Sequence, residues 1–182
     1  MRVPVSNRVG EEGQGWTIAK YLLGHERSNA SYVSINKRNL AKLKAIAQDQ
    51  VMDGRPLGED EEFKRLIAEA EVALETLSVT VTSLRQLATA SADKPVGPEA
   101  SVLKMRTGDV FQRIHELMME AGGYAVQPYV AEAVRDGWNE DPIGPEYLFR
   151  MAPDYFEARA MSIAGGSHEV QKNIIAKGVL GL

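Results

Sequence analysis

One segment has an apolar repeat that a chain can satisfy only by forming a long amphipathic helix packed against its neighbours. From Phe63 to Ala88, apolar residues recur at alternating steps of four and three positions. Such steps place the side chains on one stripe of a helix, and their alternation is typical of a seam in a helix bundle. We therefore predict a helix with a buried stripe, formed by Phe63, Ile67, Ala70, Leu74, Leu77, Val81, Leu84 and Ala88.

Similar spacing predicts helices on both sides of this segment. One long helix is expected from about residue 15 to residue 50, and the breaker DGRPLGED (53–60) follows it. After SADKPVGPEA (91–100), a third helix is expected to begin near Pro98 and to stop at Gly122–Gly123. A short helix around 154–161 leads to a last helix near the C-terminus. Four main helices with short connections predict an all-α, up-and-down four-helix bundle.

The first fifteen residues differ from the rest of the chain. Val3 and Val5 alternate with polar or proline neighbours, and three glycines follow them. This pattern predicts one short strand and a turn, without a convincing partner strand downstream. We expect residues 1–15 to be an extended arm, the end of a β-domain that is missing here, and residues 16–182 to form the bundle.

Composition excludes several classes of function. A net charge of −4 argues against a general nucleic-acid binder. The absence of cysteine excludes disulfides and thiolate chemistry, and the three histidines have no metal-ligand spacing, so we expect no metal site. No apolar run approaches the ~20 residues that span a bilayer, and no signal peptide follows Met1. The expected location is cytoplasmic.

The stretch GHERSNAS (24–31) interrupts the first predicted helix with polar residues. It is explained structurally as a solvated helix turn with an ordinary charge pair. It is explained functionally if the helix passes a ligand there. Gly24 would then allow close approach, Glu26 would accept a proton, and Arg27 would bind an anion or a carbonyl oxygen.

The stretch AGGSHEVQ (164–171) also has two explanations. Ser167 is a good N-cap, and Glu169 suits the first turn of a helix, so a structural role accounts for both. Two glycines before an N-cap are also typical of a close approach to a phosphate or a planar cofactor. His168 is placed either to contact a bound group or to face solvent. The apolar ending NIIAKGVLGL favours a subunit contact.

Three segments, in this order and spacing, resemble the C-terminal half of acyl-CoA dehydrogenases. They are RVPVSNRVGEEGQGW, LLGHERSNAS and SIAGGSHEVQKNIIAKGVLGL. The resemblance covers essentially the whole chain, and it is especially close to bacterial enzymes of the pimeloyl-CoA dehydrogenase large-subunit type. The third predicted helix also fits the family.

The resemblance implies a fold and a chemistry. Family members have a helical domain, a β-domain and a C-terminal four-helix bundle, with FAD between the last two and completed by a neighbouring subunit. A carboxylate removes the α-proton of an acyl-CoA while the β-hydride passes to the flavin, and an electron-transfer flavoprotein receives the electrons. The implied assembly is a homo-oligomer (dimer or tetramer) or a hetero-oligomer with a related subunit. An isolated C-terminal fragment is expected to be inactive.

The resemblance also implies the position of the catalytic carboxylate. Many members carry it in a Tyr-Glu-Gly-Thr turn, which here reads Ala164–Ser167, so Gly165 occupies the glutamate position. Another branch carries the base on the first bundle helix, directly before an arginine. Those positions are Glu26 and Arg27 here, and we expect Glu26 to be the base and Arg27 to bind substrate.

Further positions match the family's FAD contacts. Ser167, His168 and Glu169 correspond to the flavin contacts at the start of the last helix. Gly122 and Gly123 lie near the glycine pair that touches a partner subunit's cofactor. The alternative is a non-catalytic oligomerisation or assembly subunit that keeps the same bundle.

Overall fold

The protein is represented by a computed structural model that describes residues 2–26, 32–90, 97–141 and 144–182. The structure is dominated by helices, and the short hairpin of β1 and β2 is the sheet found within these residues. The elements in chain order are η1 (Val5–Asn7), α1 (Gly15–Glu26), α2 (Val33–Asp49), β1 (Val51–Met52), β2 (Arg55–Pro56), η2 (Leu57–Glu59), α3 (Glu61–Ala90), α4 (Glu99–Gly122), η3 (Gly123–Val126), η4 (Ala131–Val134), α5 (Met151–Arg159), η5 (Ala160–Ser162), α6 (His168–Ile175) and η6 (Ala176–Leu180).

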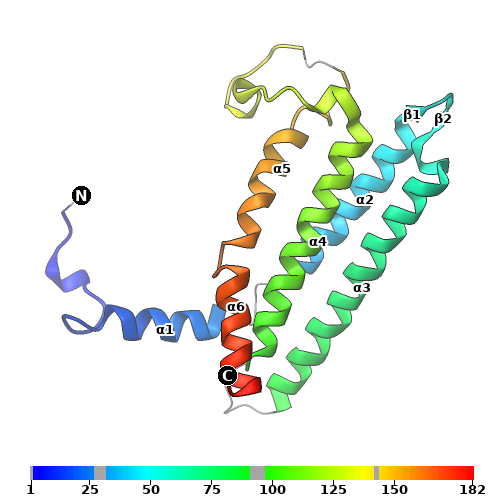
Figure 1. Ribbon diagram of the computed structural model, residues 1–182. Coiled ribbons are helices and arrows are strands. Elements are labelled where there is room, and N and C mark those ends of the chain that lie inside the picture. The colour runs from blue at the N-terminus through cyan, green and yellow to red at the C-terminus, as the bar shows by residue number, and fades with distance from the viewer. Residues whose placement is uncertain (1, 27–31, 91–96, 142–143) are drawn as a thin grey trace.

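The bundle is centred on α4, which contacts α2, α3, α5 and α6 (Figure 1). The long helices α2, α3 and α4 form three of its four packed segments, and α5 followed by α6 forms the fourth. Burial of the seam on α3 is confirmed for six members, from Phe63 to Val81, while Leu84 is half-buried. Ile114 and Leu117 of α4 are fully buried. The prediction of an all-α bundle is therefore confirmed.

The prediction of one helix from residue 15 to residue 50 is wrong. Tyr32, at the N-cap of α2, has a φ of 43°, and a right-handed helix cannot continue through such a residue. Helix α1 extends away from the bundle at a steep angle (Figure 1). It leaves Trp16, Tyr21 and Leu22 exposed, whereas the apolar side of α2 is buried in the core.

The predicted strand in the N-terminal arm does not form in the described residues. A 3₁₀ turn occupies Val5–Asn7, closed by hydrogen bonds from Asn7 N to Pro4 O and from Arg8 N to Val5 O, both 3.0 Å. Val3 and Val5 are exposed. A strand requires backbone hydrogen bonds to a neighbour, and alternation of side chains does not supply one.

The predicted helix ends are largely confirmed. Pro98 precedes α4, and α4 ends at Gly122, followed by Gly123 at a φ of 54°. Ser167 caps α6 with its hydroxyl oxygen. Beyond α6, the last predicted helix continues as the single π-helical turn η6, whose Val179 and Leu180 are exposed.

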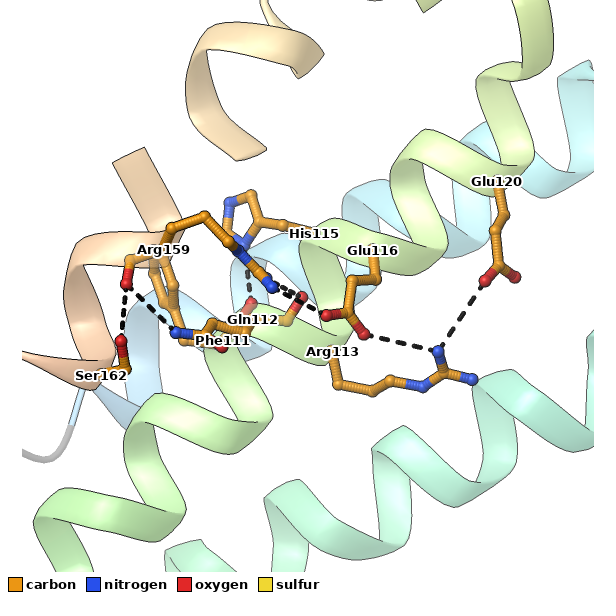
Figure 2. Close-up of polar contacts among 8 residues, drawn as sticks. All are labelled: Phe111, Gln112, Arg113, His115, Glu116, Glu120, Arg159 and Ser162. Atoms are coloured by element: carbon orange, nitrogen blue, oxygen red, sulfur yellow. Dashed lines mark hydrogen bonds and ion pairs between the residues drawn. The ribbon is translucent and has the colours of Figure 1, made fainter. Parts of the chain in front are cut away.

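A network of polar contacts joins α5 to α4 (Figure 2). Arg159 donates from Nη1 to Glu116 Oε1 over 2.9 Å and from Nη2 to the Gln112 carbonyl over 3.4 Å. The carbonyl of Arg159 accepts from Gln112 Nε2 and from the Ser162 hydroxyl. The network therefore holds the end of α5 against the middle of α4.

His115 lies beside this network and is buried. Its Nδ1 is 2.7 Å from the carbonyl oxygen of Phe111, and the two rings lie 4.4 Å apart between centroids. Burial lowers the pKa of His115, and the hydrogen bond to Phe111 opposes that change only in part. His115 is therefore a buried residue whose Nδ1 is paired with the backbone of its own helix.

Truncation of the seam should destabilise the bundle. Leu74→Ala leaves a cavity at a side chain that is 1% exposed, and we expect a loss of about 2–5 kcal/mol in the free energy of unfolding, measured by urea denaturation. The matched control Leu22→Ala, at an exposed leucine of α1, should change it by less than about 0.5 kcal/mol. Equal losses in the two variants would contradict the buried role of α3.

His115 should make stability depend on acidity. Because its folded pKa lies below the unfolded value of about 6.5, the unfolded chain binds the proton more readily as the pH falls through that range. The free energy of unfolding should therefore fall between about pH 7.5 and about pH 5.5, and the fall should be smaller in His115→Gln. Thermal denaturation of both proteins at the two pH values measures this. An identical fall would show that His115 does not contribute.

Candidate functional site

The turn before α6 is built by two glycines with left-handed backbone. Gly165 has a φ of 70° and Gly166 a φ of 96°, a region that side chains disfavour. Ser167 then accepts a hydrogen bond from the Val170 amide over 3.4 Å, which caps the helix. The prediction that Ser167 is an N-cap is therefore confirmed.

Gln171 fixes this turn from inside. Its side chain is 3% exposed, and its Nε2 donates to the Gly165 carbonyl over 3.0 Å. A Cβ on Gly166 would lie 2.7 Å from the same Nε2 atom, so the contact requires glycine at 166. Sequence reasoning missed Gln171, although its place four residues after Ser167 is the signal that it faces back to the turn.

His168 points towards α4. A Cβ added to Gly108 would lie 3.5 Å from His168 Nε2 and 3.2 Å from the Met161 carbonyl, so Gly108 allows α4 to approach the turn. The Nε2 atom is buried and has no hydrogen-bond partner in the described residues. The ring of His168 therefore lies against α4, and its contact with a bound group stays a prediction.

Lys104 and Glu169 provide the charges around the turn. Lys104 Nζ donates to the Ser162 carbonyl over 3.3 Å, and burial lowers its pKa. Glu169 is exposed, and a hydrogen bond from Ser167 lowers the pKa of its carboxyl group. A carboxylate that stays ionised here repels phosphate, so the start of α6 suits hydroxyl or N–H donors of a ligand.

Gly165 faces open space. No atom lies within 4 Å of a Cβ built there, and its neighbours in the turn provide no acidic side chain. The turn can therefore be approached closely but contains no proton acceptor at this position.

Gly122 and Gly123 lie at the far end of α4. A Cβ on Gly122 would meet Val126 Cγ1 at 2.3 Å, which explains this glycine by packing, and Gly123 is exposed. Gly122 lies fourteen positions after Gly108, which corresponds to about 21 Å of helix. The structure therefore does not bring this glycine pair together with Ser167–Glu169 within one chain.

The remaining two predicted residues are described only in part. Glu26 is the last residue of α1, and its side chain lies outside the described part. Arg27 lies wholly outside the described residues. Their positions relative to the turn therefore stay predictions.

The described ranges show neither a cluster of metal-ligating side chains nor a helix that could span a membrane. Within them, no three His, Asp or Glu side chains gather as metal ligands would. None of the helices in that part of the chain is long and apolar enough to cross a bilayer.

Comparison with known proteins finds chains that are similar to this one in sequence and in fold. Acyl-CoA dehydrogenase FadE26 of Mycobacterium tuberculosis is 27% identical over 186 residues, which cover 100% of this chain and 44% of FadE26. The crystal structure of the ChsE4–ChsE5 complex from Mycobacterium tuberculosis matches 99% of this chain and 43% of the compared chain, with 27% identity and a TM-score of 0.72. PigA with FAD and proline has the same fold, with a TM-score of 0.72, 18% identity and coverage of 99% and 42%.

The chain thus spans less than half the length of these relatives. The family model described as "Acyl-CoA dehydrogenase, C-terminal domain" matches residues 13–180, which include all of α1–α6. This chain belongs to the acyl-CoA dehydrogenase family and corresponds to its C-terminal domain.

Proposed function

We propose that this chain is the C-terminal domain of an FAD-dependent acyl-CoA dehydrogenase, active only in the full-length protein. The observation that supports this most is the family match over residues 13–180. The proposed reaction is α,β-dehydrogenation of an acyl-CoA thioester, with an electron-transfer flavoprotein as the electron acceptor.

The turn at α6 is the proposed flavin contact of this chain. The open space at Gly165 admits a flat group, and His168 holds the turn in place with its Nε2 buried beside Gly108 of α4. Ser167 and Glu169 present oxygen acceptors to hydroxyl or N–H groups. When bound, FAD supplies the hydride acceptor for the β-carbon of the substrate.

The glycine pair at 122–123 belongs to a second contact in this proposal. Along α4, this pair lies about 21 Å from Gly108, where the turn before α6 packs. The two regions are therefore too far apart to contact the same part of one FAD molecule. We assign Gly122 and Gly123 to the cofactor of a partner subunit. This assignment requires an oligomer, either of this protein or with a related subunit.

Glu26 is the proposed catalytic base. Gly165 has no side chain to accept a proton, so the base is proposed to lie on another element. Glu26 is the carboxylate that the family resemblance indicates. Arg27 is proposed to bind the substrate beside it.

Replacement of Glu26 tests the base. In the full-length protein, Glu26→Gln keeps the shape of the side chain and removes its basicity, so turnover of acyl-CoA should fall at least about 100-fold, while flavin content stays unchanged. The measurement is acyl-CoA-dependent reduction of an artificial electron acceptor, over a range of acyl chain lengths.

The control is Glu12→Gln, the same change at an exposed position of the arm, which should keep parental turnover. Undiminished turnover in Glu26→Gln would remove Glu26 from the mechanism. A full-length parent that assembles but binds no flavin and reduces no acceptor would instead support the non-catalytic assembly subunit.

A methyl group at the turn tests the flavin contact. Gly166→Ala forces a side chain to a φ of 96° and against Gln171, which displaces the turn from its proposed contact with FAD. The dissociation constant of FAD should rise about five- to tenfold, which corresponds to roughly 1 kcal/mol of binding free energy. Flavin fluorescence during titration of the full-length apoprotein measures it. Gly13→Ala, at a φ of 82° in the arm with no atom within 4 Å, is the matched control and should bind FAD normally. Equal weakening in both variants would separate the turn from flavin binding.

A further inference from the structure

The segment between α4 and α5 contains a small recess that lies outside the turn at α6. Residues 127–150 lead from η3 to α5 at the end of the bundle where α4 stops (Figure 1). The recess has a volume of about 120 Å³. At ~30 Å³ for each water molecule, this volume holds about four waters or one compact group of similar size. The apolar part of its lining consists of Ala125, Pro128, Val130, Ala133, Trp138 and Phe149.

The bundle holds this segment at both ends. Val126 and Leu148 are each 1% exposed and belong to the hydrophobic core. The Tyr147 hydroxyl donates to Asp49 at the end of α2 and accepts from Gln50 Nε2 over 2.9 Å. Because the walls of the recess are fixed in this way, a ligand can bind without first ordering a loop, which lowers the entropic cost of binding.

Two aromatic side chains form part of the wall. The ring centroids of Trp138 and Phe149 lie 5.2 Å apart, and the ring planes are inclined by 44°. Both side chains are half-buried. The face of an aromatic ring attracts cations electrostatically, and the attraction is strongest for tryptophan. This wall therefore favours a positively charged group over a neutral group of the same size.

Two adjacent carboxylates complete the lining of the recess. Glu140 and Asp141 are both exposed. Among the described residues, neither carboxylate has an ion-pair or hydrogen-bond partner. The segment 127–150 is acidic as well, with five acidic residues and two arginines. The charge of the recess therefore favours a cation that comes from outside the chain.

The lining suits an organic cation better than a metal ion. Ca²⁺ and Mg²⁺ require about six oxygen ligands or more, whereas the described residues contain no group of three His, Asp or Glu side chains that could hold a metal. A methylated ammonium group needs no such set of ligands, because methyl groups replace its N–H donors. Its methyl groups also match the apolar lining, and aromatic walls are a recognised way of binding such groups.

We propose that this recess binds the methylated ammonium group of a small organic molecule. The rings of Trp138 and Phe149 contact the methyl groups, and Glu140 and Asp141 balance the positive charge. Tetramethylammonium represents this group alone and matches the size of the recess. For so small a ligand beside exposed carboxylates, the expected dissociation constant is about 1–10 mM.

Tryptophan fluorescence tests the proposal in the full 182-residue chain. The sequence contains two tryptophans, so Trp16→Phe leaves Trp138 as the one reporter. Titration with tetramethylammonium chloride should change its emission and saturate in the millimolar range. Sodium chloride at equal ionic strength and neutral tert-butanol at equal concentration should give no saturable change. No saturable response to tetramethylammonium, or an equal response to either control, would overturn the proposal.

Neutral isosteres test the contribution of the carboxylates. In the Trp16→Phe background, Glu140→Gln combined with Asp141→Asn should raise the dissociation constant of tetramethylammonium at least about fivefold. The matched control is Glu11→Gln combined with Glu12→Gln, which neutralises two adjacent exposed carboxylates of the arm and should leave binding unchanged. Equal weakening in the two double variants would contradict a site in the recess.

Phe149→Leu tests the aromatic wall. Leucine keeps an apolar side chain but removes the ring, so the dissociation constant should rise about three- to fivefold while the circular dichroism stays native. Unchanged binding in this variant would contradict the proposed ring contact. None of these measurements depends on flavin or on dehydrogenase activity, so the site is tested apart from the proposed function.

Discussion

Burial of α4 is the constraint on which the rest of this structure depends. Helices α2, α3, α5 and α6 all pack against it, and the fully buried Ile114 and Leu117 lie near its middle. Its position also determines the two candidate contacts, because Gly108 receives the turn at α6 and Gly122 ends the helix about 21 Å further on. The polar network around Arg159 then fixes α5 on the same helix.

The turn before α6 depends on glycines that let neighbouring side chains and backbone approach closely. Gly108 lets His168 approach α4, Gly166 leaves room for Gln171, and Gln171 holds the Gly165 carbonyl. These contacts shape a surface and supply hydrogen-bond groups, but they provide no proton acceptor at Gly165. The proposed function accordingly assigns the flavin contact to the turn and the acid–base step to Glu26 on another helix.

Two parts of the chain expose apolar surface that its own core does not cover. Helix α1 extends away from the bundle with Trp16 and Tyr21 exposed (Figure 1), and α3 exposes Val72, Val79 and Leu87 outside its buried seam. The chain spans less than half the length of the relatives compared with it.

The sequence by itself determined the elements whose signals are local. The three- and four-residue steps from Phe63 to Val81 identified the buried side of α3, Gly122–Gly123 identified the end of α4, and Ser167 identified the start of α6. Tertiary structure decided the rest, because it depends on partners distant in the chain. Valine alternation formed no strand without a neighbouring strand, Tyr32 separated α1 from α2, and the contacts of Gln171 and His168 arose only when α6 packed against Gly108.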